Sequence, residues 1–129
     1  MDCPLCKEPM IVLELNEVEI DHCLACGGIW LDAGELELLL EGAEEKDKLL
    51  SSFEVDKSSK EKRRKCPICL RRMEKVLCGT QRRVRIDKCR NNDGLWFDKG
   101  ELHDILKEGH FDEDNKVLTL LDDMFGKKS

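Results

Sequence analysis

The stretch "CLACGGIWLDAGEL" (Cys23–Leu36) returns later in the chain as "CRNNDGLWFDKGEL" (Cys89–Leu102). Both share the frame Cys…Gly-x-Trp-x-Asp-x-Gly-Glu-Leu, at an offset of 66 residues. They differ where the first has Cys26, because the second has Asn92 there, followed by Asp93. An internal repeat fixes the number of structural units before any other argument. We therefore expect two related units in this chain of 129 residues.

The repeat extends upstream of these stretches. "CPLCKEPM" from Cys3 matches "CPICLRRM" from Cys66 at an offset of 63, so the second copy has three extra residues between its halves. Units of about forty to fifty residues rarely bury enough apolar surface to fold alone. They need a disulfide or metal staple, and the chain's eight cysteines are its source.

The surroundings of the cysteines favour metal. The start "MDCPLCKEPM" has no basic segment, apolar segment or cleavage signature, so we expect a cytoplasmic rather than a secreted protein. The longest apolar run, "LELLL", is too short to cross a membrane. Paired Cys-x-x-Cys motifs in a cytoplasmic chain indicate a metal site. A redox Cys-x-x-Cys would need a thioredoxin-like βαβ context, which the pattern lacks.

Two Cys-x-x-Cys pairs in the first copy, sixteen residues apart, supply the four ligands of a structural zinc site. These ligands are Cys3, Cys6, Cys23 and Cys26. Between the pairs, residues 10–15 and 18–21 alternate as strands around a turn at Asn16-Glu17. The two pairs then meet at one end of a hairpin, which is the zinc-ribbon arrangement.

The Gly-x-Trp-x-Asp segment predicts a turn, a packed ring and the start of a helix. The glycines permit unusual backbone dihedrals. Trp30 covers a small core beside the metal, with a partner anchor as the alternative role. Asp32 and Glu35 form the pattern of a capping box, repeated at Asp98 and Glu101, so helices begin near residues 33 and 99. The apolar stripe of the first helix is Leu36, Leu39, Leu40 and Ala43, and the helix could reach Leu50.

The predicted fold is a small metal-stapled α+β protein with two tandem zinc ribbons, each followed by a helix. The first ribbon and helix span residues 1–50, and a polar, basic linker spans 51–64. The second ribbon and helix span 65–110, with hairpin strands at 73–78 and 82–87. Residues 111–129 are a loop and a short amphipathic helix with Val117, Leu121, Met124 and Phe125 at helical spacing.

The motif Cys-Pro-x-Cys, then Ile-Asp-x-Cys-x-x-Cys-Gly-Gly-Ile-Trp-Leu-Asp-x-Gly-Glu-Leu, resembles the transcription-factor zinc-finger family of TFIIB-type zinc ribbons. These are small prokaryotic modules that often occur in tandem. The resemblance covers residues 2 to about 41 and 65 to about 107. It implies zinc at the four cysteines of the first copy and at Cys66, Cys69 and Cys89 of the second. It carries no catalytic residues, and a link to transcription rests on the family's name.

The fourth ligand of the second site is open in the sequence. Some similar sequences carry a histidine at the position of Asp93, and a carboxylate is an acceptable zinc ligand, so Asp93 is the first candidate. Asn92 is aligned with Cys26 but is a poor ligand. Cys78, His103, water and an empty site are the alternatives. We expect two zinc sites, the second weaker or incomplete.

Charge is distributed unevenly along the chain, whose net charge is −6. Residues 1–56 hold three basic and fifteen acidic side chains, and residues 57–90 hold fourteen basic and three acidic ones. A basic patch is the electrostatic footprint of nucleic-acid binding. The candidate contacts are Arg63, Arg64, Arg71, Arg72, Arg82, Arg83 and Arg85. The competing account is self-complementarity, in which acidic parts of the protein screen the basic ones.

These features favour a zinc-binding adaptor without enzymatic activity, acting on an unidentified protein partner. The alternative is a regulator that binds nucleic acid through the second ribbon. A third hypothesis is a redox-sensitive zinc switch. No small-molecule substrate or membrane is expected, because no H-x-E deaminase motif accompanies the three-cysteine site and no apolar run spans a bilayer.

Overall fold

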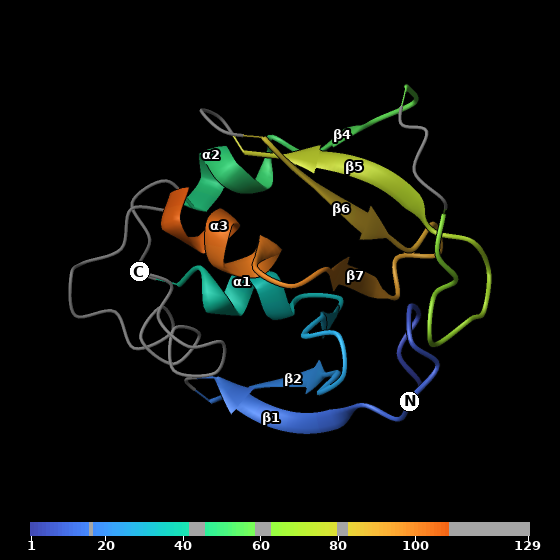
Figure 1. Ribbon diagram of the computed structural model, residues 1–129. Helices are drawn as coiled ribbons and strands as arrows, with labels where there is room; N and C mark the ends of the chain where they lie inside the picture. Colours follow the sequence, from blue (N-terminus) through green and yellow to red (C-terminus); the bar gives the residue numbers. More distant parts are fainter. Residues whose placement is uncertain (16, 42–45, 59–62, 80–82, 109–129) are drawn as a thin grey trace.

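The computed structural model describes residues 1–15, 17–41, 46–58, 63–79 and 83–108 (Figure 1). The predicted C-terminal helix, Ala43 of the first stripe and Arg82 lie outside these residues. The strands are β1 (Ile11–Leu15), β2 (Val18–His22), β3 (Ile29–Asp32), β4 (Glu54–Val55), β5 (Glu74–Cys78), β6 (Val84–Lys88) and β7 (Gly94–Phe97). The helices are α1 (Glu35–Leu39), α2 (Lys46–Leu50) and α3 (Glu101–Glu108).

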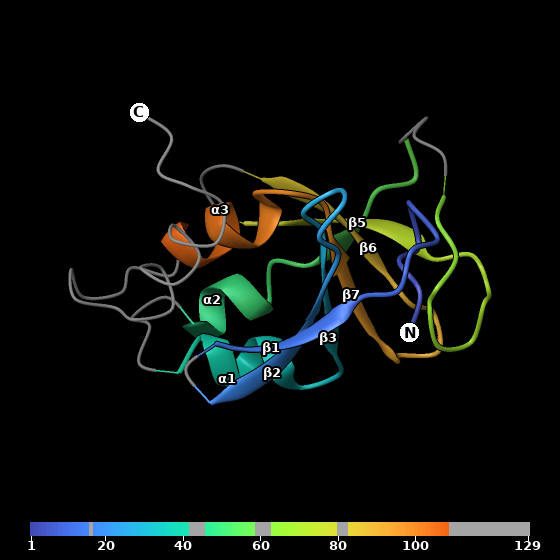
Figure 2. The same ribbon diagram turned by 60° about the horizontal axis from the view of Figure 1, so that its bottom comes forward.

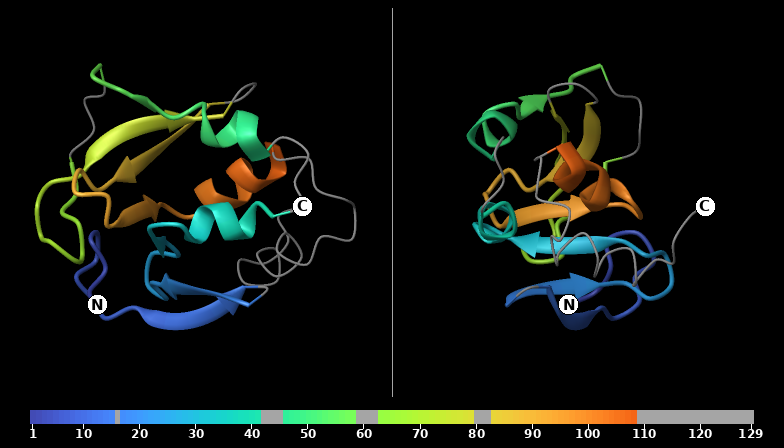
Figure 3. Two further views of the ribbon diagram at one scale, coloured as in Figure 1. Left: turned by 180° about the vertical axis from the view of Figure 1, so that it is seen from behind. Right: turned by 90° about the vertical axis from the view of Figure 1, so that its left-hand side faces the viewer.

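All seven strands form one antiparallel sheet in the order β1-β2-β3-β7-β6-β5-β4. Each copy contributes a three-stranded unit, β1-β2-β3 or β5-β6-β7, and the two units meet where β3 pairs with β7. The sheet therefore runs from the first copy at one end of the molecule to the second copy at the other (Figure 3). Strands β4 and β1 are its outermost members.

Both predicted hairpins are present, and their registers match between the copies. Ile11 pairs with His22 in the first copy, as Glu74 pairs with Lys88 in the second. Strands β3 and β7 were not predicted, because a four-residue apolar segment beside a tryptophan gives no clear period. Within the segment 51–64, assigned from sequence to a linker, Glu54–Val55 form β4 and pair with β5. The sequence predicted one helix that could reach Leu50. The structure instead has two helices in this region, because α1 ends at Leu39 and α2 is separate.

The pairing of β3 with β7, which we call the seam, relates the two copies symmetrically. Trp30 lies directly opposite Trp96, its counterpart in the repeat. A Cβ atom on Gly94 would come within 2.6 Å of the Trp30 ring, and one on Gly28 would clash with the ring of Trp96. Each glycine of the Gly-x-Trp motif therefore makes room for the tryptophan of the other copy. The motif acts between the copies as well as within each one.

Two cores lie on opposite sides of the sheet. The helices pack on one side, where the apolar stripe of α1 joins Leu49 of α2 and Ile105 of α3 in one cluster (Figure 2). The second cluster contains Trp30, Trp96 and cysteines from both copies. The two Cys-Pro-x-Cys loops lie away from the helices, at the right of Figure 1. No helix in the described part of the chain is long and apolar enough to cross a membrane.

Candidate metal centres

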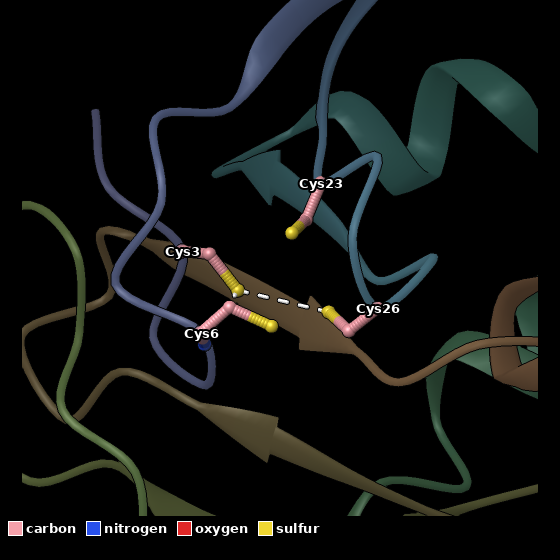
Figure 4. A group of neighbouring side chains, drawn as sticks. All are labelled: Cys3, Cys6, Cys23 and Cys26. Atoms are coloured by element: carbon pink, nitrogen blue, oxygen red, sulfur yellow. Dashed lines mark hydrogen bonds between the residues drawn. The ribbon is translucent and has the colours of Figure 1, made fainter.

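The first metal centre gathers the four predicted cysteines of the first copy. Their sulfur atoms all lie within 4.8 Å of one another. The loop before β1 supplies Cys3 and Cys6, and the turn between β2 and β3 supplies Cys23 and Cys26. The four side chains point toward one another, with 3.7 Å between the sulfurs of Cys3 and Cys26 (Figure 4). Four thiols converging from two loops fit a closed tetrahedral zinc site.

Each Cys-Pro-x-Cys loop is shaped by hydrogen bonds to its own first cysteine. The amides of Leu5 and Cys6 donate to the Cys3 sulfur at 3.3 and 3.2 Å. The amide of Lys7 donates to the Cys3 carbonyl at 3.0 Å, and Lys7 has a positive φ of 65°. The second copy repeats the turn, with Leu70 at φ 63°. Amides directed at sulfur stabilise the thiolate that a metal requires.

The second metal centre gathers Cys66, Cys69, Cys89 and Asp93, one ligand atom of each lying within 4.8 Å of the others. The Oδ2 atom of Asp93 lies 3.3 Å from the Cys89 sulfur and 3.7 Å from the Cys66 sulfur. The group fits a zinc site with one carboxylate in place of a thiolate. The structure therefore favours Asp93, the first candidate, as the fourth ligand.

The other candidates lie elsewhere. Cys78 is buried in the core on the helix side of the sheet, beside Ser52 and the Leu49 carbonyl. His103 lies on α3. Within the described residues, neither belongs to a group that could hold a metal.

A one-residue shift in the backbone explains how the second copy replaces a cysteine. In the first copy the ligand Cys26 precedes the left-handed residue, Gly27, with φ 78°. In the second copy the left-handed residue, Asn92, with φ 62°, comes before the ligand Asp93. Asparagine tolerates this conformation better than most residues. Both turns are still closed by the same bond, from the first cysteine's amide to the carbonyl of Gly28 or Gly94, at 3.0 and 3.1 Å.

The environment of the thiols makes a bound cation favourable. Burial raises the pKa of the Cys66 thiol to about 12 and raises the pKa of the Cys26 thiol well above its usual range. A hydrogen bond from the backbone of Arg71 lowers the pKa of the Cys69 thiol. Buried thiolates beside one another repel, and a divalent ion compensates both the burial and the repulsion. Zinc would therefore be held by all eight side chains in deprotonated form.

The tryptophans connect the two centres. Both rings are fully buried in the cluster that contains Cys3, Cys23, Cys66 and Cys89. This matches the predicted packing role of Trp30 and rules out an exposed anchor there. The indole N–H groups donate to Asp32 at 2.9 Å and to Asp98 at 3.0 Å. The two sites therefore share one core.

The predicted capping box is present in part. The Glu35 carboxylate accepts from the Asp32 amide at 2.6 Å, and Glu101 accepts from the Asp98 amide at 2.8 Å. Asp32 does not cap α1, whose N-cap is Gly34 with φ 91°. The side chains of Asp32 and Asp98 instead accept hydrogen bonds from the indoles. In each copy, the Asp-x-x-Glu motif therefore connects the buried tryptophan to the first residue of the following helix.

The predicted nucleic-acid contacts are spread over different environments. Arg83 pairs with Glu54 at 2.9 Å and Arg85 pairs with Asp56 at 2.7 Å. Arg64 pairs with Asp98 at 3.4 Å. Arg63, Arg71 and Arg72 are exposed around the Cys-x-x-Cys of the second copy. The structure thus places three of the seven arginines in ion pairs within the chain.

Comparison with known proteins gives one family. The family described as transcription factor zinc-finger matches residues 2–42 and 65–108, two segments that together cover more than half of the chain. Each segment contains one metal centre and the Gly-x-Trp motif. Comparisons with curated proteins and with solved structures gave no significant match.

Proposed function

The chain belongs to the transcription factor zinc-finger family, and from this premise we propose that it is a non-enzymatic adaptor, a zinc-stapled platform for a protein partner. The observation that carries this proposal is the joining of both ribbons into one sheet with a shared tryptophan core. Such an arrangement suits the presentation of a fixed surface. Its predicted cytoplasmic location is compatible with reduced thiols.

The ligand sets support a structural role for both metals. Catalytic zinc keeps one coordination position for water or substrate, whereas structural zinc is closed by four protein ligands. Each group here offers four ligand atoms, because Asp93 stands where a three-cysteine site would be open. We therefore assign neither centre a reaction.

Cobalt substitution tests this assignment. Co²⁺ in a closed tetrahedral site gives intense visible absorption that added imidazole or cyanide leaves unchanged while the protein stays folded. We expect this behaviour at both centres of the full chain. A spectrum of the second centre that changes at low imidazole would reveal an open position and contradict the structural assignment.

The alternative, a nucleic-acid-binding regulator, depends on the exposed arginines Arg63, Arg71 and Arg72. It is weakened by the ion pairs of Arg83 and Arg85 with Glu54 and Asp56, which support the self-complementary account of the charge pattern. Breaking such pairs to contact phosphate would offset part of the gain in binding.

Fluorescence anisotropy of labelled DNA and RNA over a salt series separates the two functions. The full zinc-loaded chain is the right sample, because a fragment from residue 57 onward would lack β3 and expose the edge of β7. The adaptor proposal expects no binding near physiological salt. Binding there that falls steeply with salt, and is lost in Arg63→Glu/Arg71→Glu/Arg72→Glu but kept in a matched Lys46→Glu/Lys48→Glu/Lys57→Glu control, would establish the alternative.

A further inference from the structure

The two copies differ in whether a further strand covers the outer strand of the hairpin. At the second copy's end, β4 covers the outer edge of β5. At the first copy's end, β1 pairs with β2 on its inner side, and no strand among the described residues pairs with its outer side. In Figure 1, β1 forms the lower border of the molecule and β4 lies at the upper border. Unpaired strand edges are templates for another strand.

The covered end shows what such a strand needs. Glu54 and Val55 pair with Leu77 and Val76, and the Asp56 amide donates to the Lys75 carbonyl at 2.8 Å. The acidic side chains of this segment reach over β5 to the arginines of β6. Glu54 binds Arg83 at 2.9 Å and Asp56 binds Arg85 at 2.7 Å. An acidic strand therefore covers a basic hairpin.

The repeat identifies the equivalent positions of the open end, and their charges are reversed. At the offset of 66, Arg83 and Arg85 correspond to Glu17 and Glu19. Glu14, which pairs with Glu19 across the hairpin, adds a third carboxylate on the same face. All three glutamates are exposed. On the opposite face, Leu13, which corresponds to Val76, is only partly buried against the core on the helix side.

We propose that the outer edge of β1 binds an extended, basic segment of a partner protein, which adds an eighth strand as β4 adds the seventh. The segment would carry Lys or Arg at two alternate positions, facing Glu14, Glu17 and Glu19, around an apolar residue that lies beside Leu13, as Val55 lies beside Val76. Backbone hydrogen bonds along the strand would give affinity, and the glutamates would select the charge. This inference rests on the adaptor function proposed above and names the chemistry of the partner.

Other occupants fit less well. A second copy of the chain would offer either its own β1, with the same glutamates, or its β4 segment, with Glu54 and Asp56. Both place like charges opposite each other, which destabilises cross-strand pairing. The residues after 108 carry five Asp or Glu and three Lys among positions 112–128, so the chain's own tail is also acidic.

The chain supplies a template for the probe. The peptide "SSFEVDKS" (Ser51–Ser58) contains β4, and its Glu54→Arg/Asp56→Arg form is basic at the two alternate positions. Both peptides, with blocked termini, are titrated into the ¹⁵N-labelled, zinc-loaded full chain at low salt. We expect the basic peptide to shift the amide signals of Val12, Leu13 and Glu14. We also expect it to bind at least tenfold more tightly than the acidic one.

Charge-reversed variants of the protein make the test specific. Glu14→Lys/Glu19→Lys should reverse the preference, so that the acidic peptide binds more tightly. Glu8→Lys/Glu37→Lys makes the same change of charge at exposed positions away from the edge and should retain the preference for the basic peptide. Equal affinity for the two peptides, unchanged β1 signals, or a preference that survives the edge substitutions would overturn the proposal.

Two observations on the free chain would also overturn it. Shifts of β1 amides on dilution would identify a second copy as the occupant, and nuclear Overhauser effects between residues 115–125 and β1 would identify the tail. Failure here is distinguishable from failure of the adaptor function. A chain that binds neither peptide nor nucleic acid loses this inference alone, whereas nucleic-acid binding near physiological salt contradicts the adaptor proposal whatever happens at β1.

Discussion

The second copy buries an ion pair at a place where the first copy has one apolar and one acidic residue, both accessible to solvent. Lys75 and Asp87 face each other across β5 and β6 at 2.6 Å, and both are almost fully buried. At the equivalent pair in the first copy, Asp21 lies opposite Val12, and both are accessible to solvent. The copies thus share a metal scaffold and a seam, whereas their outer strands have diverged. We infer that the second copy is closed within the chain and the first faces outward.

The comparison also applies to the metals, where the largest effects are expected. Structural zinc contributes about 10–16 kcal/mol of apparent binding free energy in small metal-stapled domains. Because Asp93 replaces a thiolate in the second centre, its zinc should leave first in a titration with a competing chelator. Asp93→Asn should weaken that centre further, and Asp93→His should strengthen it. Equal affinities at the two centres, unaffected by either substitution, would contradict the assignment of Asp93.

Emptying the second centre should also disturb the first copy, because Trp30 and Trp96 pack in one cluster with cysteines of both centres. We expect the indole signals of both tryptophans to change in NMR spectra at the first step of the titration. An unchanged Trp30 signal at that step would show that the two centres fold independently.

Breaking the buried pair should cost the second copy more than the same change costs the first. Lys75→Met leaves Asp87 with only the more distant Arg64, at 3.9 Å, as a cationic partner, and loss of one partner of a buried pair costs about 3–5 kcal/mol. Val12→Met, at the equivalent exposed position, should change stability by less than about 0.5 kcal/mol. Urea unfolding at fixed free zinc measures both. Lys75→Met/Asp87→Asn should recover part of the loss; without recovery, the cost would come from packing and not from charge.

Filling the seam from either copy should destabilise the protein. Gly94→Ala and Gly28→Ala each force a methyl group against the opposite tryptophan, and at Gly94 the methyl group also meets the Leu31 carbonyl oxygen. Overpacking typically costs about 1–3 kcal/mol. Gly100→Ala is the matched control, because its added Cβ meets nothing within 4 Å. This substitution costs only the backbone strain of a side chain at φ 86°. Urea midpoints should fall for both seam variants beyond the control, and further for Gly94→Ala, because backbone yields less easily than a side chain. A loss in one variant alone would contradict the symmetry of the seam.

The last comparison concerns two equivalent glutamates. Burial raises the pKa of Glu101 to about 8 and that of Glu35 to about 6, above an ordinary value of 4.5. In each case the folded state holds a proton that the unfolded state has released, so stability falls as pH rises between the two pKa values and then levels off. The stabilisation that protonated Glu101 gives the folded state is therefore lost as pH rises to about 8, and that of Glu35 as pH rises to about 6.

Glutamine variants isolate these two ionisations. Between pH 6.5 and 9, Glu101→Gln should gain stability relative to the parent chain, whereas Glu35→Gln should run nearly parallel to it. Unfolding at fixed free zinc gives the comparison, and the titration of the zinc ligands cancels between parent and variant. Parallel curves for Glu101→Gln would show that Glu101 ionises normally in the folded protein.

Much of the first metal centre could be predicted from the sequence, because zinc coordination imposes spacing. Two Cys-x-x-Cys pairs sixteen residues apart allow few other arrangements, and the hairpins between them follow from alternation. For the second centre, the sequence indicated three cysteine ligands but left the fourth ligand open. Whether Asp93 reaches the cysteines depends on the backbone turn at Asn92, whose positive φ is a property of the folded loop.

The sequence by itself determined the repeat, the cysteine ligands, the hairpins and the approximate starts of the helices, because each depends on neighbours close along the chain or on fixed ligand chemistry. Tertiary structure alone decided how the copies are joined. Trp30 and Trp96 look like local core residues, and Gly28 and Gly94 like turn residues, until β3 pairs with β7 and each glycine receives the other copy's ring. That pairing joins segments 66 residues apart, and it depends on the shape of two surfaces that no local pattern encodes. The same holds for β4, a two-residue strand whose partners Leu77 and Val76 lie more than twenty residues further along the chain.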